Sequence, residues 1–111
     1  MLVTDLNRTI TFYTHHLGFK TDFIYEDFYA GIAKDGCTIH LKLGNPSKEE
    51  RENRKKNEDI DLVFSVGDIR QFYEILGGTS VNILQELREM PYGLEFYITD
   101  PDDYVISFLA E

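Results

Sequence analysis

The chain lacks tryptophan, has a single cysteine among its 111 residues, and is poor in positive charge. Because Cys37 has no partner for an internal disulfide, the sequence favours a reducing, cytoplasmic setting. The chain begins with no apolar stretch that could serve as a signal peptide or membrane span. Its 11 basic and 20 acidic residues give a net charge of −9. This field repels phosphate backbones and anionic lipids, so we expect neither nucleic acid nor membrane as a partner, whereas a cationic ligand would be attracted.

The sequence does contain an internal repeat. The first half has, in order, Val3-Thr4-Asp5-Leu6, Phe12-Tyr13, Leu17-Gly18 and Thr38-Ile39-His40-Leu41, and the second has Val66-Gly67-Asp68-Ile69, Phe72-Tyr73, Leu76-Gly77 and Val105-Ile106-Ser107-Phe108. A domain built from two copies of one unit has a natural crevice between the copies. We therefore expect the functional site in that crevice.

Each copy predicts a strand, a helix and three further strands. Apolar spacing predicts helices over 6–17 and 68–76, each followed by glycine, and Asp5 can cap the first of them. Alternation and turn residues predict the strands that follow, over 19–25, 29–33, 38–43, 60–66, 81–84, 94–99 and 104–109, with an irregular stretch over 85–93. The fold class is therefore α+β, with two βαβββ modules over 1–44 and 60–111 in a single domain, 1–111. The charged connector, 45–59, has no apolar periodicity and is interpreted as a solvated loop.

Three phrases carry a family resemblance. They are Val3-Thr4-Asp5-Leu6, Phe12-Tyr13-Thr14-His15-His16-Leu17-Gly18-Phe19 and Asp100-Pro101-Asp102-Asp103. Together they resemble the vicinal oxygen chelate superfamily, also called the glyoxalase, bleomycin resistance protein and dioxygenase superfamily. The closing run from Tyr92 to Pro101 is similar to the bleomycin resistance proteins in particular. The resemblance implies mixed sheets that curl around a shared crevice, and pairing of modules between chains or side by side, hence a homodimer.

In metal-dependent members of this superfamily, the ligands come from the first and last strand of each module. The resemblance carries these positions over to His40, Ser107 and Asp61, and the fourth would fall before Met1. Histidine and aspartate bind divalent metals well, but a serine hydroxyl is a poor ligand, and a catalytic site normally has three protein ligands. We therefore expect no metal cofactor, with His40 and Asp61 as weak candidate ligands for a divalent ion.

The strand over 94–99 carries the candidate ligand-binding wall. Alternation places Glu95 and Tyr97 on one face, which the family's hairpin pattern assigns to the crevice, and Phe96 on the other. A carboxylate beside an aromatic ring suits a cationic, partly flat ligand, although Glu95 could equally be a rim residue that stays in water. In the first module the matching residues are Ala30 and Ile32.

Other candidate ligand-binding residues surround this wall. Tyr92, in a turn, is expected at the rim of the pocket, and His40, Ser107 and Asp61 are expected to line it. We expect a small-molecule binding protein of the bleomycin resistance type, of use in antibiotic resistance, that sequesters a cationic or aromatic compound without acting as an enzyme. The alternative is a metal-dependent glyoxalase-type lyase or dioxygenase that uses His40 and Asp61.

Overall fold

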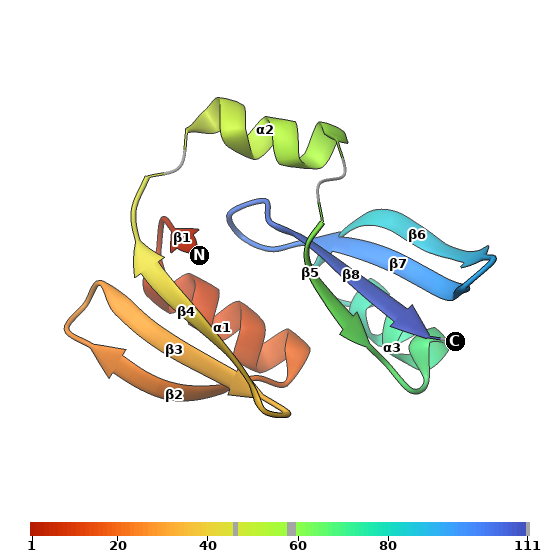
Figure 1. Ribbon diagram of the computed structural model, residues 1–111, viewed down its shortest axis with the longest axis horizontal. Coiled ribbons are helices and arrows are strands. Elements are labelled where there is room, and N and C mark those ends of the chain that lie inside the picture. The colour runs from red at the N-terminus through yellow and green to blue at the C-terminus, as the bar shows by residue number, and fades with distance from the viewer. Residues whose placement is uncertain (46, 58–59, 111) are drawn as a thin grey trace. The chain divides into compact units, whose positions relative to one another are not determined.

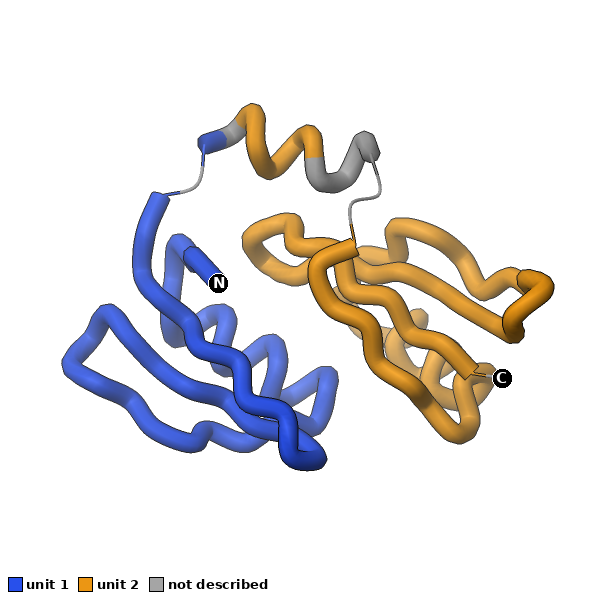
Figure 2. The backbone as a smooth tube through the Cα atoms, in the orientation of Figure 1, with its two compact units in different colours: residues 1–48 blue, residues 49–111 orange. Residues whose placement is uncertain are grey.

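The computed structural model describes residues 1–45, 47–57 and 60–110 of the chain. The chain divides into two compact units, residues 1–48 and 49–111, shown in blue and orange in Figure 2. In each unit, one strand, one helix and three further strands follow in order, and the four strands form a mixed sheet (Figure 1). The predicted α+β class and the repeated βαβββ module are therefore confirmed. No helix in the described part of the chain is long and apolar enough to cross a membrane.

The first unit is built on a sheet with the strand order β1-β4-β3-β2. Its elements are β1 (Leu2–Val3), α1 (Leu6–Leu17), β2 (Lys20–Tyr25), β3 (Tyr29–Lys34) and β4 (Cys37–Leu43). Strand β1 runs parallel to β4, and the other pairs are antiparallel. The capping prediction is confirmed, because the Asp5 side chain accepts a hydrogen bond from the Arg8 amide and Gly18 ends α1 with φ of 75°.

The second unit repeats this topology with the strand order β5-β8-β7-β6. Its elements are β5 (Ile60–Ser65), α3 (Ile69–Gly77), β6 (Asn82–Met90), β7 (Gly93–Thr99) and β8 (Val105–Ala110). Strand β5 runs parallel to β8. Asp68 caps α3 by accepting a hydrogen bond from the Gln71 amide at 3.2 Å, as Asp5 caps α1.

Aromatic rings form the core between α3 and the second sheet. Phe96 on β7 packs against Phe108 on β8 with ring centroids 5.0 Å apart. Phe72 and Tyr73 of α3 contact the same pair, at 4.9 Å from Phe108 and 5.0 Å from Phe96 respectively. The prediction that Phe96 faces the helix layer is therefore confirmed, and residues Glu95 and Tyr97 lie on the opposite face of the sheet.

Two segments differ from the expectations. The stretch over 85–93, expected to be irregular, is mostly strand β6, which continues to Met90 and forms a hairpin with β7. The pairing register shifts twice along β6, so bulges interrupt the alternation that would have revealed the strand.

The connector contains helix α2 (Lys48–Asn57), although a loop was expected. Glutamate, lysine and arginine favour helices, and Glu49 and Glu50 in the first turn interact well with the helix dipole. Its Arg51 pairs with Asp103 at 3.2 Å. Residues 46, 58 and 59 of the predicted connector lie outside the described residues.

The aromatic core predicts a large loss of stability for Phe96→Ala. Deleting a fully buried phenylalanine removes its contacts and leaves a cavity, which costs roughly 3 to 5 kcal/mol. Chemical denaturation of the variant should show this loss in the free energy of unfolding. Ile75→Ala is the control, because Ile75 is 58% exposed on the same helix layer; it should change stability by about 0.5 kcal/mol or less. Equal effects of the two changes would contradict the assignment of the strand faces.

Candidate functional site

Four side chains form a polar and aromatic cluster on the face of the second sheet that is turned away from α3. They are Arg88 on β6, Tyr92 in the hairpin turn, and Glu95 and Tyr97 on β7, and we call them the hairpin cluster. Arg88 lies directly opposite Glu95 in the antiparallel register. On the other side of β7, Tyr97 lies opposite Ser107 of β8. Three of the residues predicted to bind ligand, Glu95, Tyr97 and Tyr92, are thus brought together, with Ser107 beside them.

The Glu95 carboxylate is the centre of the hairpin cluster. Its Oε2 accepts hydrogen bonds from Arg88 Nη2 at 2.9 Å and Nε at 3.3 Å. Its Oε1 accepts a hydrogen bond from the Tyr92 hydroxyl. Glu95 is only 2% exposed, so it is not the rim residue in water that the sequence left open. Because a buried carboxylate must be paired, these three bonds are what allows Glu95 to lie there.

Arg88 links the carboxylate to the ring of Tyr97. Its Nη2 also donates to the Tyr97 hydroxyl at 3.3 Å, and its Cζ lies 5.5 Å from the centroid of the Tyr97 ring. The hydrogen bond to Glu95 raises the pKa of Arg88. Burial raises the pKa of Tyr97, and the nearby Glu95 carboxylate raises it further. The cluster therefore holds a neutral phenol beside a fixed guanidinium–carboxylate pair.

Sequence reasoning missed Arg88, although a signal for it existed. The Pro91-Tyr92 turn separates two strand segments, and pairing them across it places Arg88 opposite Glu95. Opposite charges at directly facing positions of a hairpin stabilise each other. The expected irregular stretch over 85–93 concealed this pairing.

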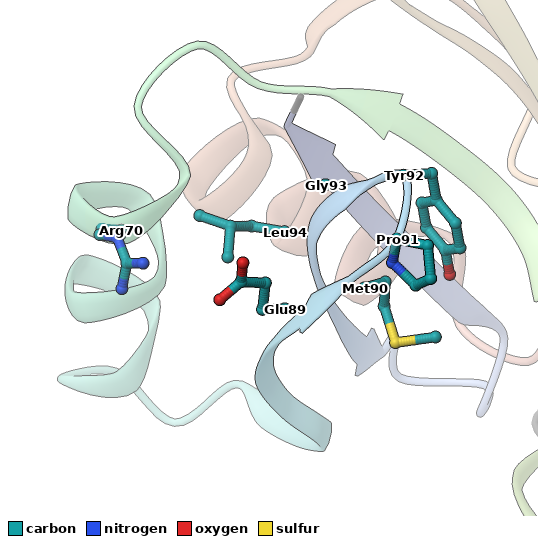
Figure 3. Close-up of a pocket in the computed structure, with 7 residues that line it drawn as sticks. All are labelled: Arg70, Glu89, Met90, Pro91, Tyr92, Gly93 and Leu94. Atoms are coloured by element: carbon teal, nitrogen blue, oxygen red, sulfur yellow. The ribbon is translucent and has the colours of Figure 1, made fainter.

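A cavity of about 530 Å³ lies beside the tip of the same hairpin. It is lined by Arg70 of α3 and by residues 89 to 94, shown in Figure 3. In this view Glu89 and Leu94 point toward the helix that carries Arg70, whereas Met90 and Tyr92 lie on the other side of the hairpin. The prediction of a pocket rim at the Tyr92 turn is therefore consistent with a hollow at this place. Tyr92 belongs both to this lining and to the hairpin cluster.

The corresponding face of the first unit carries His40 with two aromatic rings. The Tyr29 hydroxyl and His40 Nδ1 are hydrogen-bonded at 2.7 Å. The Phe23 ring stacks on Tyr29 and meets His40 edge on, at 5.9 and 5.4 Å between centroids. Gly31 pairs with His40, and the Phe23 ring occupies the space that a side chain on Gly31 would need. His40 is thus an exposed strand histidine with an aromatic environment.

Ile32 does not share this face, which corrects its place in the predicted wall. Because His40 pairs with Gly31, Ile32 and Ala30 point to the opposite side of the sheet, where both are fully buried. The equivalents of Glu95 and Tyr97 are Tyr29 and Gly31, since Ser107 pairs with Tyr97 as His40 pairs with Gly31. The expected match was displaced by one residue, and such a displacement exchanges the two faces of a strand.

The candidate metal ligands do not fit a catalytic metal centre. Asp61 Oδ2 accepts a hydrogen bond from the Val105 amide at 2.9 Å, beside a bulge in β5, so this carboxylate stabilises the strand pairing. His40 Nδ1 is bonded to Tyr29, and Ser107 is a neutral hydroxyl. Over 1–45, 47–57 and 60–110, no three His, Cys, Asp or Glu side chains are grouped so as to hold a metal ion. His40, Asp61 and Ser107 therefore do not supply the three strong ligands that a catalytic metal site requires.

Each βαβββ unit carries polar and aromatic side chains on the face of its sheet opposite its helix. Two such modules in one chain define a class of α+β protein. The sequence profile of the Glyoxalase/Bleomycin resistance protein/Dioxygenase superfamily matches residues 1–108. The chain belongs to this superfamily, and the predicted resemblance is confirmed. A search of curated proteins found no significant match.

Solved structures with the same fold cover almost the whole chain. UcmS2 has 25% identity and a TM-score of 0.78, covering 98% of this chain and 92% of its own. The bleomycin-binding protein from Streptomyces verticillus, solved with copper(II)-bleomycin, has 19% identity and a TM-score of 0.67, covering 99% and 90%. A glyoxalase/bleomycin resistance protein/dioxygenase from Alicyclobacillus acidocaldarius has 15% identity and a TM-score of 0.73, covering 99% and 86%. At 19% and 15% identity, the last two show a common fold alone.

The raised pKa of Tyr97 predicts a loss of stability at alkaline pH. Since folding favours the neutral phenol, this contribution is complete below the unfolded pKa of about 10 and is lost as pH rises through the higher folded pKa. Unfolding free energies between about pH 9 and 12 should therefore fall more steeply for the native chain than for Tyr97→Phe. Tyr25→Phe, at a side chain that is 61% exposed, should keep the native slope. Identical slopes for all three proteins would refute the burial of the Tyr97 hydroxyl.

Proposed function

We propose that this chain is a small-molecule binding protein of the bleomycin resistance type, which sequesters a compound without transforming it. The observation that carries the proposal is the hairpin cluster, where Arg88 and Tyr92 hold the Glu95 carboxylate and aromatic rings lie beside this fixed ion pair. Such an arrangement suits a site that recognises its ligand by complementary shape and by van der Waals contact. Of the two expected ligand chemistries, cationic and aromatic, the aromatic one has the better support, because Tyr92 is 53% exposed beside the cavity.

Two further features belong to this proposal. Apolar side chains at exposed positions of the strands, such as Ile24 and Val63, support association with a second copy of the chain as a homodimer. The single cysteine supports a cytoplasmic place of action. The name of the Streptomyces verticillus protein, which shares the fold, makes bleomycin the first ligand to try.

Bleomycin binding should depend on the exposed Tyr92 ring. Removing an aromatic contact surface costs about 1 kcal/mol, so Tyr92→Ala should weaken bleomycin affinity about fivefold in calorimetric titrations. Tyr25→Ala removes a ring from the first unit that is also more than half exposed, and it should leave the affinity unchanged. Absence of bleomycin binding, together with no small molecule retained by the purified protein in native mass spectrometry, would argue against sequestration.

The metal-dependent alternative can be tested in the same native mass spectra. Protein purified without added metal should carry well under one equivalent of zinc, nickel, manganese or iron, and a chelator should leave its thermal stability unchanged, because weak ligands do not link metal binding to folding. The spectra should also show twice the mass of one chain. If the native protein carries stoichiometric metal and the His40→Ala variant does not, the result would contradict the binding function and support the metal-dependent lyase or dioxygenase.

A further inference from the structure

Both oxygens of the Glu95 carboxylate, which was expected to anchor a cationic ligand, already accept hydrogen bonds. Arg88 donates to Oε2 through two nitrogens, and Tyr92 donates to Oε1. With 2% of Glu95 exposed, a ligand ammonium group could reach it only by displacing one of these donors. Displacing Arg88 would leave two cations competing for one carboxylate. The cluster therefore offers a ligand little negative charge.

What remains open to a ligand is a hydrogen-bond donor beside an aromatic ring. Nε and Nη2 of Arg88 make its bonds to Glu95 and Tyr97, so in the described part of the chain Nη1 is left with two unused N–H groups. The Arg88 side chain is 36% exposed and the Tyr92 residue 53%. Arg88 and Tyr92 are neighbours because they bond the two oxygens of the same carboxylate.

We propose that the ligand is an aromatic acid whose carboxylate accepts hydrogen bonds from Arg88 Nη1 while its ring packs on Tyr92. This inference rests on the proposed binding function and names the chemical class of its ligand. An ionised carboxylate is a strong acceptor for the N–H groups of a guanidinium, and such charge-assisted bonds are stronger than neutral ones. The net charge of −9 opposes an anion at long range, but salt screens that field within about 10 Å at 0.1 M, whereas the contact with Arg88 remains.

Two naphthalene probes of opposite charge test the inference. 2-Naphthoate and 2-naphthylmethylammonium share one ring system, so the difference between their affinities reports the charge preference of the site. At about 0.1 M salt we expect the native protein to bind 2-naphthoate about tenfold more tightly than the ammonium compound, in titrations followed by naphthalene fluorescence.

Two charge-neutralising variants identify the residue responsible. Arg88→Gln should remove the preference for 2-naphthoate, because it removes the Nη1 donor and its positive charge. Arg70→Gln is the matched control: it deletes the same charge beside the same hairpin, from a residue that lines the cavity but lies outside the hairpin cluster. It should keep the native preference. If Arg88→Gln fails to fold by circular dichroism, Arg88→Lys should keep the fold and weaken the preference, since a lysine that bonds Glu95 has no second nitrogen equivalent to Nη1 for the ligand.

The outcomes separate this inference from the function on which it rests. Binding of neither probe, together with no retained small molecule, would count against the binding function itself. Tighter binding of the ammonium probe would overturn the aromatic acid and leave the binding function standing. A preference that is lost in Arg70→Gln and kept in Arg88→Gln would also overturn it, because the anion would then lie in the cavity beside α3 instead of on the hairpin cluster.

Discussion

The packing of Phe96 and Phe108 against α3 determines which face of the second sheet each residue of β7 lies on. Both rings are buried, and they meet Phe72 and Tyr73 of the helix at centroid distances of 4.9 and 5.0 Å. Since side chains alternate along a strand, burying Phe96 on one face forces Glu95 and Tyr97 onto the other. A change of one residue in this register would bring a carboxylate into the aromatic core.

Placing Glu95 on the face of the sheet turned away from α3 creates a second constraint. A nearly buried carboxylate is strongly unfavourable unless it is paired and hydrogen-bonded. The β6–β7 register satisfies this requirement by bringing Arg88 opposite Glu95, and the hairpin turn adds the Tyr92 hydroxyl. The ion pair in turn fixes the guanidinium over the Tyr97 ring. The functional proposal therefore follows from the pairing that makes burial of one acidic residue possible.

Local signals in the sequence predicted much of the fold. The Asp5 cap, the glycine stops and the repeated order of elements depend on neighbours within a few residues, and all three are observed. Strand β6 was predicted only in part, because bulges break its alternation. Helix α2 was missed for a different reason. Its composition favours a helix, but it lacks the apolar stripe on which the prediction of a helix depended.

The candidate site likewise has one part that the sequence predicted and another that only the structure showed. The sequence by itself determined that Glu95, Tyr97 and Tyr92 belong to one strand and its turn, and that Phe96 faces the other way, because alternation is a property of a single strand. Only the tertiary structure showed that Arg88 donates hydrogen bonds to the Glu95 carboxylate and that Ile32 lies in the core of the first unit. Both facts depend on the register between two strands, which arises from cross-strand pairing and from bulges rather than from the residues of either strand alone.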